Sequence, residues 1–244
     1  MLYIGRMSAP LILLHASMAA TKLSDLYNHH LCSFAAILKC LKTQGATLHY
    51  ISTPTANAAF TSDIISDGAM AGASPSDTKG REGYIIFRRY GDIGHPIQWC
   101  ARRLRRVARS SATVEILAAV DAMSNGLYLQ HLLRGMHVIH PTELTVDSTS
   151  LQSLSTSIKE PEERLNKVDL PSIGEAFDEG DLTAVHWCPG KQLLADPLTK
   201  DNPHTAALLL NALSTGQHIR PLETKTNLGQ DAQISASPLS LIHI

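Results

Sequence analysis

One stretch, residues 99–119, constrains the fold of this chain more than any other part of the sequence. It runs from the end of a predicted strand, through a cluster of arginines, into a long helix predicted over about 111–134. Apolar residues occupy two faces of that helix, so we expect it to be largely buried. It carries one acid, Glu115, near its start. Taken alone, Glu115 is explained as a helix-favouring residue near the positive end of the helix dipole.

Composition places the chain among globular proteins and limits what it can bind. Its 244 residues are 44% hydrophobic and 18% charged, which is enough apolar material for a packed core. The net charge is -1, so any binding of nucleic acid has to come from a local basic patch. The four scattered cysteines form no Cys-x-x-Cys pair and predict free thiols in a reducing compartment.

The apolar run at 9–20 is the one segment that resembles a targeting signal. It is too short to span a bilayer, and His15 interrupts it. We therefore expect an intracellular protein, cytoplasmic or nuclear, without a targeting signal and without contact with a membrane.

The predicted helices and strands follow an α/β order. Helices are expected near 8–20, 25–43, 111–134, 147–157, 161–178, 192–200 and 205–213, and strands near 60–66, 83–90, 95–100, 142–147 and 182–187. The second and third strands form a predicted hairpin around residues 90–94, and the turn-rich segment 52–57 is a predicted linker. The order predicts a five-stranded mixed sheet with helices on both faces.

Four acids fall where such a sheet would carry a site. Asp67 follows the first predicted strand, Asp147 ends the fourth, Glu115 begins the long helix, and Asp196 opens the helix predicted at 192–200. The crevice of an open α/β sheet lies outside the carboxyl ends of its strands, where Asp67 and Asp147 fall. Each acid alone has a structural explanation as a turn residue, a helix cap or a first-turn acid. The four acids in this order of elements are a more specific signal.

Six segments carry more detailed motifs, at 66–72, 83–87, 96–99, 105–115, 144–147 and 187–200. Together they resemble the ribonuclease H domain at the end of copia-type retrotransposon polyproteins. The last segment, which ends Ala-Asp-Pro-Leu-Thr-Lys, is similar to the closing signature of that family and is the most specific. The likeness covers about residues 4–215. It implies a helical remnant of a reverse transcriptase tail at 1–55 and a ribonuclease H-like domain at 56–216. The polar, unpatterned composition of the C-terminal segment predicts a disordered tail at 217–244.

This resemblance implies an endonuclease that hydrolyses the RNA strand of an RNA–DNA hybrid and leaves a 3′-hydroxyl and a 5′-phosphate. Its four carboxylates would hold two Mg²⁺ ions about 3.5–4 Å apart, with Mn²⁺ as a possible substitute. Asp67 would bridge both ions, with Asp147 as the other principal ligand. Glu115 would hold one ion and touch the substrate, and Asp196 would hold the other. Other domains derived from the same polyprotein are further expected partners.

The arginines between the third strand and the long helix supply a local positive patch. They are Arg102, Arg103, Arg105, Arg106 and Arg109. Such a patch binds the phosphates of either nucleic-acid strand, and Lys191, before the last core helix, would extend it. The alternative is a solvated connection between a strand and a helix. Ser110 and Ser111 are the candidate caps of the long helix.

The chain departs from the family pattern at several positions. Met70 replaces an aromatic residue that makes a packing contact, and Lys191 occupies the region where many ribonucleases H carry a histidine. Pro171 and Gly174 fall in a helix that the family keeps uninterrupted, where they cost about 3 and about 1 kcal/mol. Because no polymerase palm precedes the domain, no DNA synthesis is expected, and the chain resembles a truncated copy.

Two other functions compete with hybrid cleavage. The helix breakers Pro171 and Gly174 motivate a non-catalytic remnant that keeps the fold and the basic run but binds nucleic acid without turnover. A transposase or integrase of the same general fold is disfavoured, because those proteins resemble a three-acid pattern and this chain carries the closing motif around Asp196.

Overall fold

The computed structural model describes residues 9–20, 35, 39, 42, 48–51, 59–70, 79–149, 151 and 166–218. Its elements are α2 (Pro10–Ala20), β1 (Thr61–Ala69), β2 (Arg81–Tyr90), β3 (Ile93–Arg103), α4 (Ser111–Gly135), β4 (Thr142–Val146), α6 (Asn166–Asp178), β5 (Ala184–Trp187), η1 (Gly190–Gln192), η2 (Asp196–Leu198) and α7 (Pro203–Thr215). The strands form one sheet in the order β3-β2-β1-β4-β5. β1, β2 and β3 pair antiparallel, whereas β4 pairs parallel with both β1 and β5. The predicted five-stranded mixed sheet flanked by helices is confirmed.

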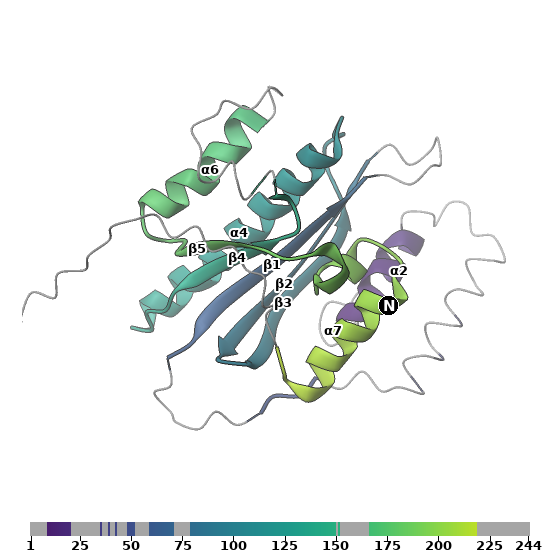
Figure 1. Ribbon diagram of the computed structural model, residues 1–244, viewed down its shortest axis with the longest axis horizontal. Helices are drawn as coiled ribbons and strands as arrows, with labels where there is room; N and C mark the ends of the chain where they lie inside the picture. The colour runs from purple at the N-terminus through teal and green to yellow at the C-terminus, as the bar shows by residue number, and fades with distance from the viewer. Residues whose placement is uncertain are drawn as a thin grey trace, which may run out of the picture.

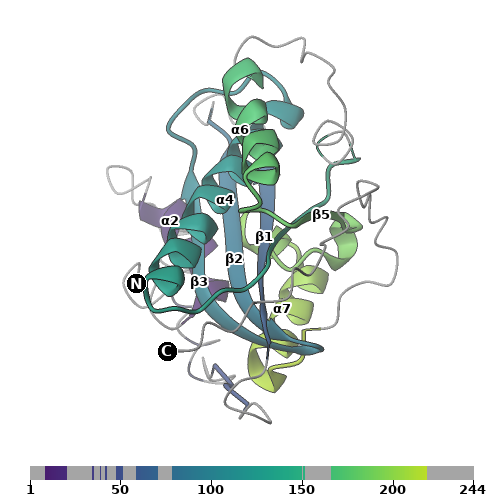
Figure 2. The ribbon, with the colours of Figure 1, turned by 90° about the vertical axis from the view of Figure 1, so that its left-hand side faces the viewer.

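Helices cover both faces of the sheet, with α4 and α6 on one side and α2 and α7 on the other (Figure 1). Figure 2, turned by 90°, shows α4 and α6 in front of the strands. The first face packs Ile64, Leu144 and Ile173 into one apolar cluster with α4. The second packs Phe87 and Leu209 with Leu13 of α2. The alternation of apolar side chains along β1 and β2 therefore fills two separate cores, one on each side of the sheet.

Local sequence explains how the hairpin and its edge form. The β2–β3 turn uses Gly91, whose φ of 58° suits glycine. β3 is an edge strand, so it can accept Pro96, which has no amide hydrogen to donate to a neighbouring strand. The register shifts between Ile86 and Phe87, next to the pairing of Phe87 with Pro96. The proline and the irregularity therefore coincide.

The long helix α4 begins and ends at recognisable residues. The Ser110 side chain accepts a hydrogen bond from the Thr113 amide at 3.2 Å, which confirms one of the two predicted caps; Ser111 is the first helical residue. The helix ends at Gly135, and His137 follows with a φ of 61°. Buried residues lie along both predicted apolar faces. In α6 the helix runs through Pro171 and Gly174, so neither residue ends it.

The helix predicted over 192–200 is wrong. The chain instead forms the two short 3₁₀ turns η1 and η2, with i to i+3 bonds such as Thr199 N to Asp196 O at 3.0 Å. Pro197 has no amide hydrogen to donate to the Leu193 carbonyl, which explains why an α-helix does not pass through this position. The carboxylate of Asp196 also bonds to side chains further along the chain, which ties the turn to α7.

Several other predictions fall outside the described residues. They are most of the helix at 25–43, the linker at 52–57, most of the helix after Asp147 and the tail beyond residue 218. The structure does place Leu13 of α2 in the same core as the sheet. It also places Gln217 and His218, beyond the predicted domain end at 216, against the β2–β3 hairpin. Among the described residues, no helix is long and apolar enough to cross a membrane.

Candidate active site

Asp67 lies near the end of β1, and Asp147 directly follows the neighbouring parallel strand β4. The register pairs Ile65 with Thr145, so Asp67 and Asp147, each two residues further on, come level at the same edge and on the same face. Asp67 is buried, and Asp147 is half-buried. The predicted pairing of these two acids at the carboxyl ends of neighbouring strands therefore follows from the sheet register.

The Asp67 carboxylate is bonded on both oxygens. Thr199 donates its hydroxyl to Oδ2, and the Lys200 ammonium lies 3.0 Å from Oδ1. Burial raises the pKa of Asp67 to about 6, and the nearby charge of Asp147 adds to the rise, while Lys200 and Thr199 oppose it. The buried environment therefore destabilises the ionised form of Asp67.

Glu115 and Asp147 belong to the same electrostatic cluster. Burial raises the pKa of Asp147, with Glu115 and Asp196 raising it further and Lys200 lowering it. The turn η1 also approaches Asp147 closely, because a Cβ at Gly190 would lie 3.1 Å from its Oδ2. Trp187 donates its indole N–H to the Asp147 carbonyl at 2.9 Å, which fixes the backbone there. Asp147 therefore lies against η1, close enough to Glu115 and Asp196 for their charges to affect its pKa.

Asp196 is buried and held by three side chains. Its Oδ1 accepts from Lys200 at 2.9 Å, and its Oδ2 accepts from Asn202 at 3.0 Å and Thr205 at 2.7 Å. Asn202 caps α7, and Thr205 lies in its first turn. Asp196 therefore joins the η2 turn to the start of α7, in addition to lying near Asp147.

The four acids suit Mg²⁺ in the kind of atom that they offer. Every donor is a carboxylate oxygen, the ligand that Mg²⁺ prefers, and, besides burial, the charges of Glu115 and Asp196 contribute to the raised pKa of Asp147. Among the described residues, however, no three Asp, Glu, His or Cys side chains stand together in a ready-made metal site.

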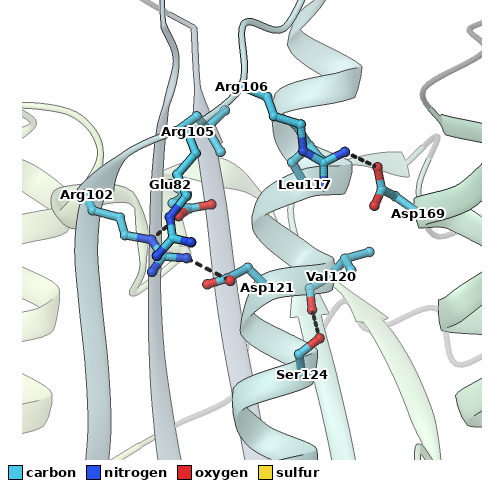
Figure 3. A pocket seen from close by; sticks show the side chains of 10 residues that line it. Glu82, Arg102, Arg105, Arg106, Leu117, Val120, Asp121, Ser124 and Asp169 are labelled. Carbon is cyan, nitrogen blue, oxygen red and sulfur yellow. Dashed lines mark hydrogen bonds and ion pairs between the residues drawn. The ribbon is translucent and has the colours of Figure 1, made fainter.

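The arginine patch is divided between structural and unpaired members. Arg102 pairs with the buried Glu82 and, at 2.7 Å, with Asp121, while Arg106 lies 3.3 Å from Asp169. These residues line a cavity of about 300 Å³ between the β2–β3 edge, α4 and α6, which Figure 3 shows. Glu82, Asp121 and Asp169 therefore have a structural role, because they pair with arginines of the basic run.

The remaining basic residues are exposed, apart from Arg103, which is half-buried. Arg105, Arg109 and Lys191 form no ion pair with any residue in the described part of the chain. Lys191 lies on η1, next to Gly190 and therefore on the side of Asp147. The basic residues with free charges are thus fewer than the sequence predicts.

Sequence reasoning missed the residues that hold the acids. Thr199 and Lys200 contact Asp67, whereas the sequence indicates them only as the end of a motif. It also missed Asp63, which is fully buried on the same face of β1 and lies 2.8 Å from His218 Nε2. The alternation of Asp63, Ile65 and Asp67 along a strand was an available signal for the shared face.

Comparison with protein-family models and with curated protein sequences gives no match. Comparison with solved structures gives several, among them a complex of LC11 ribonuclease H1, a protein isolated from compost, with an RNA/DNA hybrid. That structure has a TM-score of 0.45 and 16% identity, and the match covers 60% of this chain and 99% of that chain. The ribonuclease H domain of PFV gives 0.42 and 17%, covering 67% and 98%. The N-terminal ribonuclease H domain of Rv2228c from Mycobacterium tuberculosis gives 0.42 and 14%, covering 61% and 97%.

Proposed function

We propose that this chain is a metal-dependent ribonuclease that cuts the RNA strand of an RNA–DNA hybrid, derived from a copia-type retrotransposon. The observation that carries the proposal is the register of β1 and β4, which brings Asp67 and Asp147 level at one sheet edge. Glu115 and Asp196 lie close enough to influence the pKa of Asp147. Clustered, partly buried carboxylates are costly without cations, which supports a role in binding a metal.

In this proposal Asp67, Glu115 and Asp147 hold the metal and face the scissile phosphate. A divalent cation held there would supply Lewis-acid stabilisation of the charge that develops on the phosphate during hydrolysis. Thr199 orients the Asp67 carboxylate by donating to its Oδ2. Trp187 fixes the Asp147 backbone. The contact of Gly68 with the backbone of Glu115 sets the distance between β1 and the start of α4.

The substrate would be recognised through its shape and its phosphates. Ribose 2′-hydroxyls distinguish the RNA strand in the shallow minor groove of an A-like duplex. The exposed side chains of Arg105, Arg109 and Lys191 are available to bind phosphates. Arg102 is committed to Glu82 and Asp121 and would act by holding the β3 edge in place.

A second candidate is a nucleic-acid-binding protein without turnover. The contact that favours it is the Lys200 ammonium, which already joins Asp67 and Asp196. The absence of a ready-made metal site among the described residues points the same way. In that case the free arginines would be the functional residues and the acids would serve stability.

Cleavage of a labelled RNA–DNA hybrid separates these functions. We expect cuts in the RNA strand that require Mg²⁺ or Mn²⁺ and disappear in Asp67→Asn. The matched control is Asp201→Asn, a change at an exposed acid one residue after Lys200. A folded protein that binds the hybrid and never cuts it would establish the binding function instead. Cleavage of plain DNA duplex with equal efficiency would contradict the proposed substrate.

A further inference from the structure

The cavity of about 300 Å³ beside the basic run lies apart from the candidate active site (Figure 3). None of the four acids is among the described residues that line it. Its walls come from the start of β2, the end of β3, and the helices α4 and α6. Its volume is within the range of small-molecule sites in proteins. A ligand bound in this cavity would therefore depend neither on the acids nor on a metal.

Two ion pairs build opposite walls of this cavity. On the strand side, Arg102 bonds to the buried Glu82 through Nε and to Asp121 at 2.7 Å through a terminal nitrogen. On the α6 side, Arg106 lies 3.3 Å from Asp169. Arg102 therefore holds the wall in place, and most of its hydrogen-bonding capacity is already used.

Arg105 supplies a guanidinium group with free donors. Its side chain is exposed, and it forms no ion pair with any residue that the structure describes. Burial raises the pKa of Glu82, and the charges of Arg102 and Arg105 oppose this rise, which places Arg105 on the strand side of the cavity. Figure 3 shows Arg105 pointing toward that side, whereas Arg106 points toward Asp169. A planar guanidinium in this position can bind a phosphate group through two N–H donors.

Asp121 offers an acceptor on the same side of the cavity. Its Oδ1 accepts from Arg102, whereas its Oδ2 lies 3.5 Å from the Asn125 amide nitrogen, which is long for a hydrogen bond. The Asp121 side chain is 30% exposed, so a ligand can reach it. Its second oxygen can therefore accept an N–H group of a ligand.

Apolar side chains lie between the charged walls. Leu104 and Leu117 are buried, Val120 is half-buried, and all three line the cavity. Ser124 follows one turn after Val120, is exposed, and bonds to the Val120 carbonyl at 2.8 Å. The cavity thus combines an apolar surface that suits a flat ring with a cationic donor and an anionic acceptor.

We propose that this cavity binds a nucleotide, with its phosphate on Arg105, its base against Leu117 and Val120, and an amino group of the base on Asp121. The inference goes beyond the proposed function, because it involves none of the four acids. The nucleotide is either free or the unpaired terminal nucleotide of a nucleic-acid strand, since both present the same groups. Adenine and cytosine carry an amino group that a carboxylate accepts, whereas uracil has a carbonyl oxygen at that position.

Calorimetric titration of the full chain with adenosine 5′-monophosphate, in the presence of a chelator, tests the site. We expect binding that is weaker by about tenfold for adenosine, which lacks the phosphate, and also weaker for uridine 5′-monophosphate. Arg105→Gln should lower the affinity for the nucleotide to that for adenosine. Ser124→Trp fills the cavity and should abolish binding. Tyr128→Trp is the matched control, at an exposed residue one turn further along α4 and outside the cavity lining.

A comparison of two hybrids identifies the source of the nucleotide. Tighter binding of a hybrid with one unpaired 3′ adenosine than of a blunt hybrid, lost in Ser124→Trp, supports the inference with a strand end as ligand. Binding of adenosine 5′-monophosphate without that preference supports it with a free nucleotide. If neither probe binds, or if binding is equal in Ser124→Trp and Tyr128→Trp, the inference is wrong.

The fold of the variants and the proposed function are checked separately. If Ser124→Trp fails to fold, Arg105→Gln decides, because an unchanged affinity for adenosine 5′-monophosphate contradicts the inference and a reduced one supports it. A chain that binds the nucleotide and never cleaves the hybrid would overturn the proposed function alone. A chain that cleaves the hybrid and binds neither probe in the cavity would overturn this inference alone.

Discussion

Gly68 lies directly against the backbone of Glu115. A Cβ at position 68 would be 2.8 Å from the Glu115 amide nitrogen and equally close to the Val114 carbonyl group. Strand β1 and the start of helix α4 therefore approach each other as closely as a glycine allows. Since Asp67 precedes Gly68, this contact brings two of the candidate ligands, from a strand and from a helix, to one edge of the sheet.

We expect Gly68→Ala to destabilise the protein and to weaken the site. The new methyl group would meet backbone atoms, which cannot rotate away, so β1 and α4 have to separate at a cost of about 1–3 kcal/mol. Hybrid cleavage should fall more than tenfold, because a displacement of catalytic groups by about 1 Å is costly. Urea unfolding and a cleavage assay at a temperature where the variant is folded measure the two effects.

The matched control is Gly174→Ala in α6, where an added Cβ meets no atom within 4 Å. This change should stabilise the protein by up to about 1 kcal/mol, because alanine favours helix more than glycine does. Equal stability of the two alanine variants would show that β1 and α4 are further apart in solution than in the structure.

Arg102 is expected to be a stability residue and not a nucleic-acid contact. Its partner Glu82 is buried, and burial already raises the pKa of that carboxyl despite the nearby guanidinium. Arg102→Gln should therefore cost about 2–3 kcal/mol, because it leaves a buried charge without its partner. Arg106→Gln should cost less, about 1 kcal/mol, although its partner Asp169 is also buried, because Arg106 is 59% exposed and water screens its 3.3 Å pairing with that carboxylate. Thermal unfolding of both variants distinguishes the two arginines.

Nucleic-acid binding should depend on the arginines that lack ion pairs. We expect Arg105→Gln and Arg109→Gln each to weaken hybrid binding and to reduce the slope of log affinity against log salt by about 1, with stability unchanged. Fluorescence anisotropy across a salt series measures this slope. An unchanged slope in the double variant would show that the hybrid binds elsewhere on the molecule.

The sheet was predictable from sequence because its strands carry local signals. Gly91 marks the hairpin, Ser110 caps α4, and alternating apolar residues define β1 and β2. The pairing of Asp67 with Asp147 was predictable because the parallel register of β1 and β4 brings the two acids level. Those features depend on neighbouring residues or on one strand pairing.

The contacts that modify the site were not predictable in the same way. Lys200 reaches Asp67 across 133 positions of sequence, and His218 reaches Asp63 across 155. Such contacts depend on where a turn places a side chain, which periodicity does not reveal. The failed helix at 192–200 has a local cause in Pro197, which sequence reasoning accepts because proline is tolerated close to the start of a helix.

Asp67 should make the metal-free protein more stable as the pH falls. Its pKa rises on folding from 3.8 to about 6, so the folded state binds more protons than the unfolded state between those values. The contribution of Asp67 to stability is therefore most favourable below about pH 4 and is lost as the pH rises through about 6. The full difference corresponds to about 3 kcal/mol.

Asp67→Asn isolates this effect, because the amide does not titrate. With a chelator present, the free energy of unfolding of the wild type relative to Asp67→Asn should increase between pH 7 and pH 4.5. Added Mn²⁺ should stabilise the wild type at pH 7 more than at pH 5, since the ion requires the ionised carboxylate. A difference between the two proteins that is independent of pH would show that Asp67 has an ordinary pKa.

His218 should anchor the end of the domain to the sheet. Its ring stacks on Phe87 with centroids 4.7 Å apart, and its Nε2 lies 2.8 Å from the fully buried Asp63 carboxylate. His218→Ala removes both contacts and leaves the buried Asp63 carboxylate without its histidine partner. We therefore expect the free energy of unfolding in urea to fall by about 2–4 kcal/mol. His204→Ala, at an exposed position near the start of α7, should have little effect. If the two variants are equally stable, residues 216–218 do not pack on the sheet in solution, and the other contacts of Asp63, among them those with Arg89 and Thr145, suffice to hold it.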